Sequence, residues 1–301
     1  MKLDQIKLDK DNDYILSNSL ETKYNLEEEL DIISVKNKTS EEKILFLEIM
    51  ESSLETKGKK IEITPTGYQF GLRHIRDGIT YFGYEKPTKN SKEKLIDYII
   101  NPKEEIVDNR FIGQHFRIKY DKKNSLYYLK DLGHGFGTFV KLNKIIEIKN
   151  NYLIGIGNNY IILTLGYDED TFLKDCSTNE NTKDDDNDKI INVKIFSENL
   201  KHGILSFDKS KEKIIVGRCS EADVIIEDNM LSRLHCTIFF RNNKWYLSDG
   251  FITDNRINKS TNGTWLYAFD DIIIENGTIF KSNHNLFICF NIVIISLSFI
   301  N

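Results

Sequence analysis

Proline is scarce in this sequence, with three residues among 301. Long polyproline linkers, which need a high density of proline, are therefore excluded. The four cysteines are scattered and form no Cys-x-x-Cys pair, and the first residues show no secretory signal. We therefore expect reduced thiols in a cytoplasmic or nuclear protein, without a metal site.

Several functional signatures are also missing. The sequence has no Walker A loop and no protein-kinase signature, so neither a nucleotide-binding site of that type nor another cofactor is expected. Its formal net charge of −5 does not favour bulk binding to nucleic acid, and any recognition of phosphate must be local.

Aromatic residues are abundant. The 18 Phe and 14 Tyr can fill two β-sheet cores, and 301 residues suffice for two domains of ordinary size. With 40% hydrophobic and 29% charged residues, the composition is that of a globular chain.

Short apolar runs separated by polar turns mark the stretch from Ile214 to Leu266. The runs Ile214–Val216, Val224–Ile226 and Cys236–Phe240 are rich in β-branched and aromatic residues, which is typical of strands. The polar groups fall where each strand would give way to a loop. Binding residues are commonly placed at such junctions.

Four short motifs follow one another along this stretch. They are Gly217-Arg218, Ser232-x-x-His235, Thr261-Asn262 and Gly263-Thr264-Trp265. In this order, with strand-like runs between them, they resemble a forkhead-associated (FHA) domain that covers Ile190 to Ile300. The resemblance implies an eleven-stranded β-sandwich whose apical loops hold a phosphothreonine peptide.

The resemblance implies a phosphopeptide-binding set of Arg218, Ser232 and Asn262, with Thr261 beside the asparagine and Arg233 as a further candidate. A phosphothreonine carries close to two negative charges and three acceptor oxygens. An arginine offers it a bidentate fork, a serine hydroxyl donates to a second oxygen, and an asparagine amide both donates to and accepts from a peptide main chain.

Other motif residues are expected to be structural. Gly217 and Gly263 shape loops, and Asp223 is expected to orient the loop that follows Arg218. His235 is expected to be hydrogen-bonded within the loop framework. A catalytic pair of Ser232 and His235 is not favoured, because no acidic partner and no oxyanion-type elbow accompany them. We therefore do not expect an enzyme.

The first half of the chain contains a weaker version of the same pattern. Segments at Thr80–Lys86, Asn109–Tyr120 and Leu132–Leu142 parallel the three motif regions, which indicates an internal repeat. Gly83, His115, Gly137 and Thr138 are retained. Four other positions differ: Tyr84 replaces Arg218, Ile112 replaces Ser232, Gly135 replaces Thr261 and Phe136 replaces Asn262.

These replacements would leave a dianionic phosphate without compensating donors. We therefore predict a degenerate first copy that folds without binding phosphopeptides. Strands are expected at Lys60–Thr64, Thr80–Gly83, Phe116–Tyr120, Leu126–Lys130 and Tyr160–Leu165.

Two helices are also predicted. The first covers Ser40 to Leu54, where Thr39 and Glu42 have the spacing of a capping box. The second lies at Ser91–Ile100, within an insert that interrupts the first copy.

The sequence thus predicts an all-β protein with two FHA-type sandwiches in tandem. Its expected divisions are a charged N-terminal region (1–55), the degenerate copy (56–167), an acidic linker (168–189) and the intact copy (190–301).

The expected function is that of an adaptor that docks on phosphothreonine-containing proteins. The alternative is a scaffold or oligomerisation module that uses both sandwiches independently of phosphate. Membrane anchoring through the apolar end Leu286–Ile300 is not favoured, because that run is short and Asn291 interrupts it.

Overall fold

The structure is a computed structural model that describes residues 42–52, 56–70, 77–84, 96–100, 112–135, 137–166, 190–197, 203–253, 256–282 and 286–295. Every helix or strand assigned within these residues is a β-strand. Among them, no helix has the length and apolar character to cross a membrane.

Ten strands come before the expected acidic linker. They are β1 (Glu42–Ser52), β2 (Lys60–Ile63), β3 (Ile79–Tyr84), β4 (Tyr98–Ile99), β5 (Gly113–Asp121), β6 (Leu126–Asp131), β7 (Thr138–Lys141), β8 (Ile146–Glu147), β9 (Tyr152–Ile156) and β10 (Asn159–Leu165).

Twelve strands follow it. They are β11 (Ile190–Phe196), β12 (Gly203–Asp208), β13 (Lys213–Gly217), β14 (Val224–Ile225), β15 (Cys236–Arg241), β16 (Lys244–Asp249), β17 (Phe251–Ile252), β18 (Ile257–Asn258), β19 (Trp265–Tyr267), β20 (Ile272–Ile274), β21 (Ile279–Ser282) and β22 (Leu286–Ile295).

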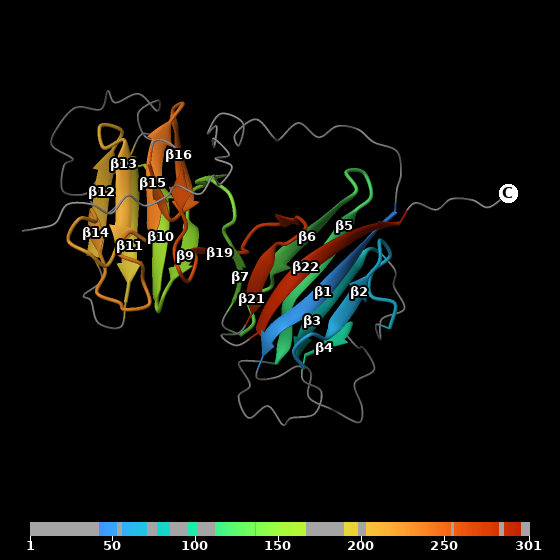
Figure 1. The fold of residues 1–301 in the computed structure, drawn as a ribbon. Helices are drawn as coiled ribbons and strands as arrows, with labels where there is room; N and C mark the ends of the chain where they lie inside the picture. The colour runs from blue at the N-terminus through green and yellow to red at the C-terminus, as the bar shows by residue number, and fades with distance from the viewer. Residues whose placement is uncertain are drawn as a thin grey trace, which may run out of the picture.

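The strands form one long sheet and two shorter ones (Figure 1). The long sheet has ten strands in the order β12-β11-β10-β9-β19-β7-β21-β22-β1-β2. The five-stranded sheets have the orders β14-β13-β15-β16-β8 and β4-β3-β5-β6-β20, and β17 and β18 form a separate hairpin. Each five-stranded sheet packs on one half of the long sheet, so two cores result.

The two cores are nested along the chain. One core draws its buried residues from a continuous segment, Leu142 to Leu266. The other combines Leu45 to Val140 with Ala268 to Phe280. We call the first the inner sandwich (142–267) and the second the outer sandwich (42–141 with 268–295).

Strand pairing explains this nesting. β10 pairs with β11, and β8 pairs with β16, which completes the inner sandwich with strands from before the acidic segment. In return, β20 pairs with β6 and β22 pairs with β1. The expected tandem of two consecutive sandwiches is therefore not confirmed, because strands from both sides of the acidic segment enter each sandwich.

The acidic segment was expected to link the two sandwiches, but it connects two strands of the same sandwich. Residues 167–189 lie outside the described residues, but their flanks meet: the Gly166 N–H donates to the Ile190 carbonyl at 2.9 Å. The segment therefore joins two neighbouring antiparallel strands of the inner sandwich, and it does not link one sandwich to the other.

The predicted N-terminal helix is wrong, because Glu42–Ser52 is the strand β1. Leu45, Leu47 and Ile49 alternate along it and are buried in the outer core. This period of two is that of a strand, and pairing with β2 and β22 outweighs the local capping signal. Thr39 and Ser40 lie outside the described residues.

The predicted helix in the insert is not formed in its described part. Residues 91–95 lie outside the described residues, and Tyr98–Ile99 is the strand β4, parallel to β3. The Asp97 carboxylate accepts the Tyr81 N–H at 2.9 Å, which fixes the chain beside β3. The five strands predicted in the first half are confirmed as β2, β3, β5, β6 and β10.

Candidate functional site

The predicted site residues lie at one end of the inner sandwich. β13 and β15 are antiparallel, with Val216 opposite Cys236, so the end of β13 lies beside the beginning of β15. Arg218 follows β13 directly, and Ser232 lies on the loop that enters β15. Backbone hydrogen bonds from Arg218 N to Ser232 O and from Cys219 N to Arg233 O, each 3.3 Å, join these two loops.

Arg218 is exposed at the edge of this loop cluster. Its Nε donates to the Leu231 carbonyl at 2.9 Å, which fixes the base of the guanidinium. Its two terminal nitrogens have no hydrogen-bond or ion-pair partner in the described part of the chain. A guanidinium held at Nε and open at both ends of its fork suits a bidentate anion.

Ser232 connects its loop with the loop that precedes β19. Its Oγ accepts the Thr261 N–H at 3.0 Å and lies 3.4 Å from Thr261 Oγ1. The hydroxyl–hydroxyl contact is long, so an incoming phosphate oxygen can replace it at little cost. The two hydroxyl groups therefore meet at one point of the surface.

Asn262 occupies the next position. Its Nδ2 donates to the Met230 carbonyl at 2.7 Å, and its own carbonyl accepts the Trp265 indole N–H at 3.1 Å. The Asn262 and Arg218 side chains thus donate to the carbonyls of Met230 and Leu231, respectively. The next residue, Ser232, accepts a hydrogen bond from the Thr261 N–H. The structure brings these three predicted residues together, with Thr261 between them.

Arg233 lies at the rim. Its guanidinium pairs with Glu221 at 2.8 Å, and both side chains are exposed. Exposed pairs of this kind contribute little to stability. Arg233 is near the loop cluster, but its guanidinium is paired with the Glu221 carboxylate.

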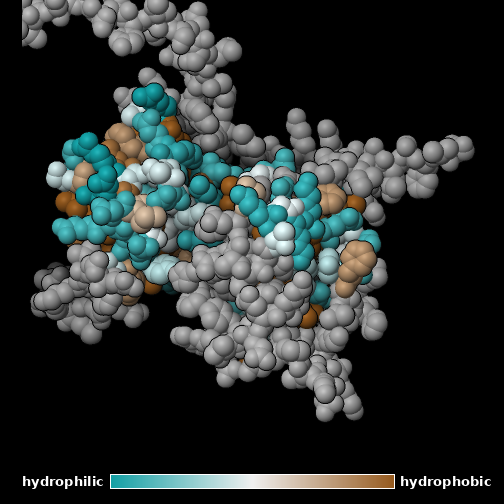
Figure 2. All heavy atoms as spheres, turned by 60° about the horizontal axis from the view of Figure 1, so that its bottom comes forward, coloured by the Kyte–Doolittle hydropathy of each residue, from teal (hydrophilic) through white to brown (hydrophobic). Residues whose placement is uncertain are grey.

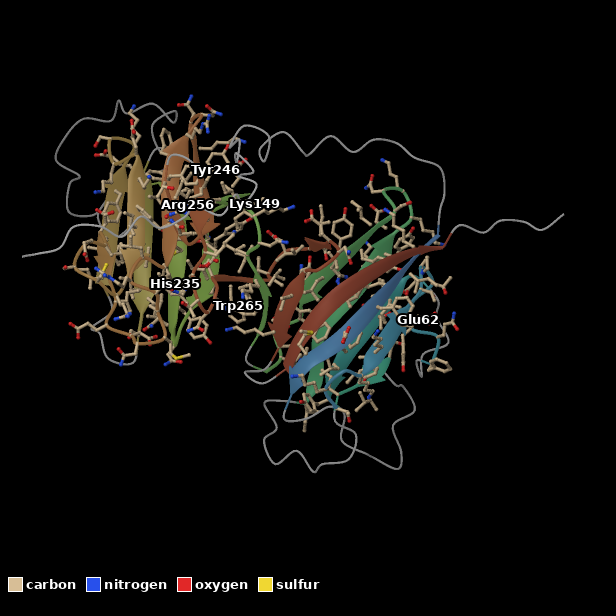
Figure 3. The ribbon with its side chains drawn as sticks, viewed as in Figure 1. Glu62, Lys149, His235, Tyr246, Arg256 and Trp265 are labelled. Atoms are coloured by element: carbon tan, nitrogen blue, oxygen red, sulfur yellow. The ribbon has the colours of Figure 1, made fainter. Side chains whose placement is uncertain are left out.

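His235 is fully buried and connects the loops internally (Figure 3). Its Nδ1 accepts the Ser232 N–H at 3.1 Å, and its Nε2 lies 3.2 Å from the Gly263 carbonyl. The neutral ring with the proton on Nε2 satisfies both contacts. Burial lowers the pKa of His235, against the opposing effects of the Gly263 carbonyl and Asp249. The expected structural role of His235 agrees with these contacts.

Two glycines and an aspartate shape the same loops. A β-carbon on Gly217 would lie 2.1 Å from the Arg233 carbonyl oxygen, and one on Gly263 would lie 2.4 Å from Lys141 Cε. Asp223 accepts the Ile215 N–H at 2.8 Å, which fastens the chain after Arg218 to β13. These three residues act on the shape of the site.

Sequence reasoning missed two aspartates. Asp249 is buried and accepts hydrogen bonds from the hydroxyls of Ser260 and Thr264, which hold the turn around Asn262. Asp228 accepts the Met230 N–H at 2.8 Å and supports the segment before Ser232. The only sequence signal was their position: Asp249 ends a strand run before a glycine, and Asp228 lies in a polar turn.

Asp228 accepts hydrogen bonds from residues that precede the acidic segment in the sequence. Asn158 N and Asn159 Nδ2, in the β9–β10 hairpin, donate to Asp228 Oδ2 at 2.9 and 2.7 Å. A β-carbon on Gly157 would lie 2.4 Å from the same oxygen. The β9–β10 hairpin, which precedes the acidic segment, thus contacts a loop of the candidate site.

The corresponding end of the outer sandwich has different side chains. Tyr84 is buried and its ring packs against His115, with centroids 5.0 Å apart. Gly113 stands where the inner sandwich has Arg233, and a β-carbon there would lie 2.7 Å from the His134 ring. Phe136 lies outside the described residues. Figure 2, in which the bottom of Figure 1 comes forward, shows a mainly hydrophilic surface on the described part of the inner sandwich.

Comparison with known proteins gives one family. Residues 214–288 match the family model of the FHA domain. The matched segment includes β13 to β19 of the inner sandwich and continues through β20 and β21 of the outer one. A search of curated proteins finds no match to this chain. FHA domains are protein-interaction modules that bind phosphothreonine.

Proposed function

We propose that the chain is a phosphothreonine-dependent adaptor, whose inner sandwich binds phosphopeptides through Arg218, Ser232 and Asn262. Arg218 provides the fork for the phosphate, Ser232 with Thr261 provides hydroxyl donors, and Asn262 reads the peptide main chain. Arg233 lies at the rim, where its guanidinium pairs with Glu221, and it would contact a bound peptide when that exposed pair opens. The observation that carries the proposal is the open guanidinium fork of Arg218, fixed at Nε on the Leu231 carbonyl, next to the loop position of Ser232.

The outer sandwich, in this proposal, is a degenerate FHA-type sandwich that does not bind phosphate. Two features support the shared origin: both five-stranded sheets have equivalent strand orders, and Asp97 and Asp223 accept corresponding N–H groups of β3 and β13. The absence of binding is supported by Tyr84, whose buried ring stands in place of an exposed guanidinium.

The test uses the full chain with a library of phosphothreonine peptides and the same peptides unphosphorylated. Fluorescence anisotropy should show a preference of roughly 30- to 150-fold for the phosphorylated set, since charge-assisted bonds of this kind contribute roughly 2–3 kcal/mol. Arg218→Ala should abolish that preference. Arg117→Ala, which removes a guanidinium from the outer sandwich, is the matched control and should retain it.

Two results would contradict the proposal. Equal binding of phosphorylated and unphosphorylated peptides by the wild-type chain would favour the phosphate-independent scaffold. Phosphate-dependent binding that survives Arg218→Ala but is lost on substitutions at the Tyr84 end would overturn the assignment of the outer sandwich.

A further inference from the structure

Trp265 lies at the junction of the two sandwiches and beside the candidate site (Figure 3). It begins β19 and is paired with Lys141 of β7, the contact that joins the halves of the ten-stranded sheet. Its indole N–H donates to the Asn262 carbonyl at 3.1 Å. One hydrogen bond therefore separates this ring from the residue proposed to read the peptide.

Two lysines pack against Trp265. The Nζ of Lys281, in β21, lies 4.8 Å from the centroid of the indole, and the Nζ of Lys141 lies 5.8 Å from it. Lys281 also lies 5.6 Å from the ring of Phe139. Both lysines belong to strands of the outer sandwich, so the outer sandwich brings positive charge to the edge of the inner one.

The stem of Lys141 lies next to the candidate site without a hydrogen bond to its predicted binding residues in the described part of the chain. Its Cε would be only 2.4 Å from a β-carbon placed on Gly263, so its stem lies against the backbone of the turn that carries Asn262. A peptide that contacts Asn262 and runs on over the turn at Gly263 would therefore approach Lys141. Lys281 is the next cation beyond the same indole.

Neither ammonium group has a carboxylate partner in the described residues, and each lies near an aromatic ring. Contact with a ring face compensates a cation only in part. Lys281 is also largely buried, and this burial lowers its pKa. Two half-buried cations that lie near the same indole and have no carboxylate partner in the described residues favour an anionic ligand.

We propose that Lys141 and Lys281 form a second anion subsite, which takes an acidic group on a residue that flanks the phosphothreonine of the bound peptide. The group is a carboxylate or a second phosphate, since both present anionic oxygens to an ammonium. This proposal rests on the proposed phosphothreonine binding of the inner sandwich. It gives the outer sandwich a part in ligand selection, although its own end lacks the phosphate-binding residues.

The test measures binding of the full chain to phosphothreonine peptides in which each flanking position in turn carries alanine, glutamate or phosphoserine. At one or more positions, the acidic residue should tighten binding by about ten-fold over alanine, the scale of a partly desolvated charge pair. Lys281→Met and Lys141→Met should each reduce this gain while leaving the preference for phosphothreonine over threonine intact. A larger gain with phosphoserine than with glutamate identifies phosphate as the preferred group, a larger gain with glutamate identifies the carboxylate, and equal gains mean that the subsite accepts either anion.

Controls separate charge from packing. Lys130, whose Nζ lies 5.9 Å from the ring of Phe269, also stacks on an aromatic residue, and Lys130→Met should keep the full acidic gain. Lys281→Arg keeps the charge and should restore the gain lost in Lys281→Met. Thermal unfolding of each variant verifies that it is folded.

The outcomes distinguish the two proposals. If the wild-type chain prefers phosphothreonine but is indifferent to acidic flanks, or if both methionine variants retain the acidic gain, the second subsite is overturned and the proposed function stands. If the wild-type chain does not distinguish phosphothreonine from threonine, both proposals fail.

Discussion

The ends of the inner and outer sandwiches share a backbone and differ in chemistry. In the inner sandwich the Ile226 N–H donates to the Gly217 carbonyl at 2.9 Å, and in the outer one the Ile100 N–H donates to the Gly83 carbonyl at 2.9 Å. A β-carbon on either glycine would lie about 2 Å from a carbonyl oxygen of the neighbouring strand, 2.1 Å at Gly217 and 2.0 Å at Gly83. The main chain therefore follows the same path at both ends.

The side chains use that path differently. Position 218 places an exposed guanidinium at the surface, whereas the corresponding Tyr84 turns into the core and packs on His115. A frame maintained by glycines, aspartates and a buried histidine thus persists where the polar surface groups are replaced. The comparison teaches that the backbone frame and the exposed polar side chains on it are separable, since the frame is kept at both ends and the polar side chains at one.

The largest expected effect comes from cutting the chain. Residues 190–301 lack β8 to β10, which carry the buried Ile154, Ile156, Ile161 and Leu163 of the inner core. Each such residue contributes about 1.5–3 kcal/mol, so their loss rivals the whole stability of a domain. Fragment 190–301 should therefore be unfolded by circular dichroism, whereas fragment 142–267, which has every strand of the inner core, should fold.

The reverse result would break the nested arrangement. A folded fragment 190–301 with cooperative unfolding would mean that β20 to β22 can close the inner sandwich, and that the two sandwiches are consecutive. Tests of peptide binding on the second copy alone should for this reason use the full chain or fragment 142–267.

The next effect comes from exchanging residues between the two ends. Tyr84→Arg places a guanidinium at a position that is 3% exposed, and a buried charge without a partner costs about 3–5 kcal/mol. The opposite exchange, Arg218→Tyr, changes an exposed side chain and should alter stability by less than about 0.5 kcal/mol while removing phosphopeptide binding. Urea unfolding and anisotropy measure the two quantities. Equal destabilisation by both exchanges would show that the two ends do not differ in burial.

The sequence predicted the local features well. Short β-branched runs foretold β13, β14 and β15, and the motif order placed Arg218, Ser232 and Asn262 on loops that do meet. A strand run is visible in a few consecutive residues. Once β13 and β15 pair as antiparallel neighbours, the loop after β13 must lie beside the loop before β15. Tyr84 and Ile112 likewise identified the outer end as chemically different.

The nested strand order was not predictable from the pattern. β8 to β10 and β20 to β22 have similar apolar character and equivalent places in the repeat, so either set satisfies either five-stranded sheet. The choice between them depends on long-range pairing, as with β8 on β16 and β20 on β6, which no local signal records. β1 was misread for a related reason: its alternation of Leu45, Leu47 and Ile49 was hidden by apolar residues on the other face.

A smaller effect should follow from the hairpin that supports the site. Gly157 has φ of +54°, and its β-carbon would lie 2.4 Å from Asp228 Oδ2, so Gly157→Ala should shift the loop that leads to Ser232. We expect a loss of phosphopeptide affinity of roughly ten-fold, or about 1.4 kcal/mol. Isothermal titration calorimetry measures this loss.

Gly277 provides the matched control in the outer sandwich. It has φ of +79°, and no atom lies within 4 Å of its β-carbon position. Gly277→Ala should therefore cost about 1 kcal/mol of stability from backbone strain and leave affinity unchanged. If both alanine variants weaken binding equally, the effect is one of general strain, and the hairpin does not support the site.

The smallest effect expected is a dependence of stability on pH that arises from His235. Burial lowers its pKa in the folded state, while the unfolded chain keeps the ordinary value near 6.5. The unfolded state therefore binds a proton first as the pH falls, so the contribution of the neutral ring is complete above about pH 6.5 and declines below it. Protonation at Nδ1 would also remove the acceptor for the Ser232 N–H.

His235→Asn retains an acceptor near the position of Nδ1 but does not titrate, so its unfolding free energy should fall less steeply than that of the wild type between about pH 6.5 and 5. Urea unfolding of the unliganded chain is the suitable measurement, because a phosphopeptide titrates in the same range. Equal slopes in the two proteins would mean that the ring can accept its proton within the folded loops. The bridge from Ser232 to Gly263 would then depend less on the neutral tautomer than the contacts of His235 indicate.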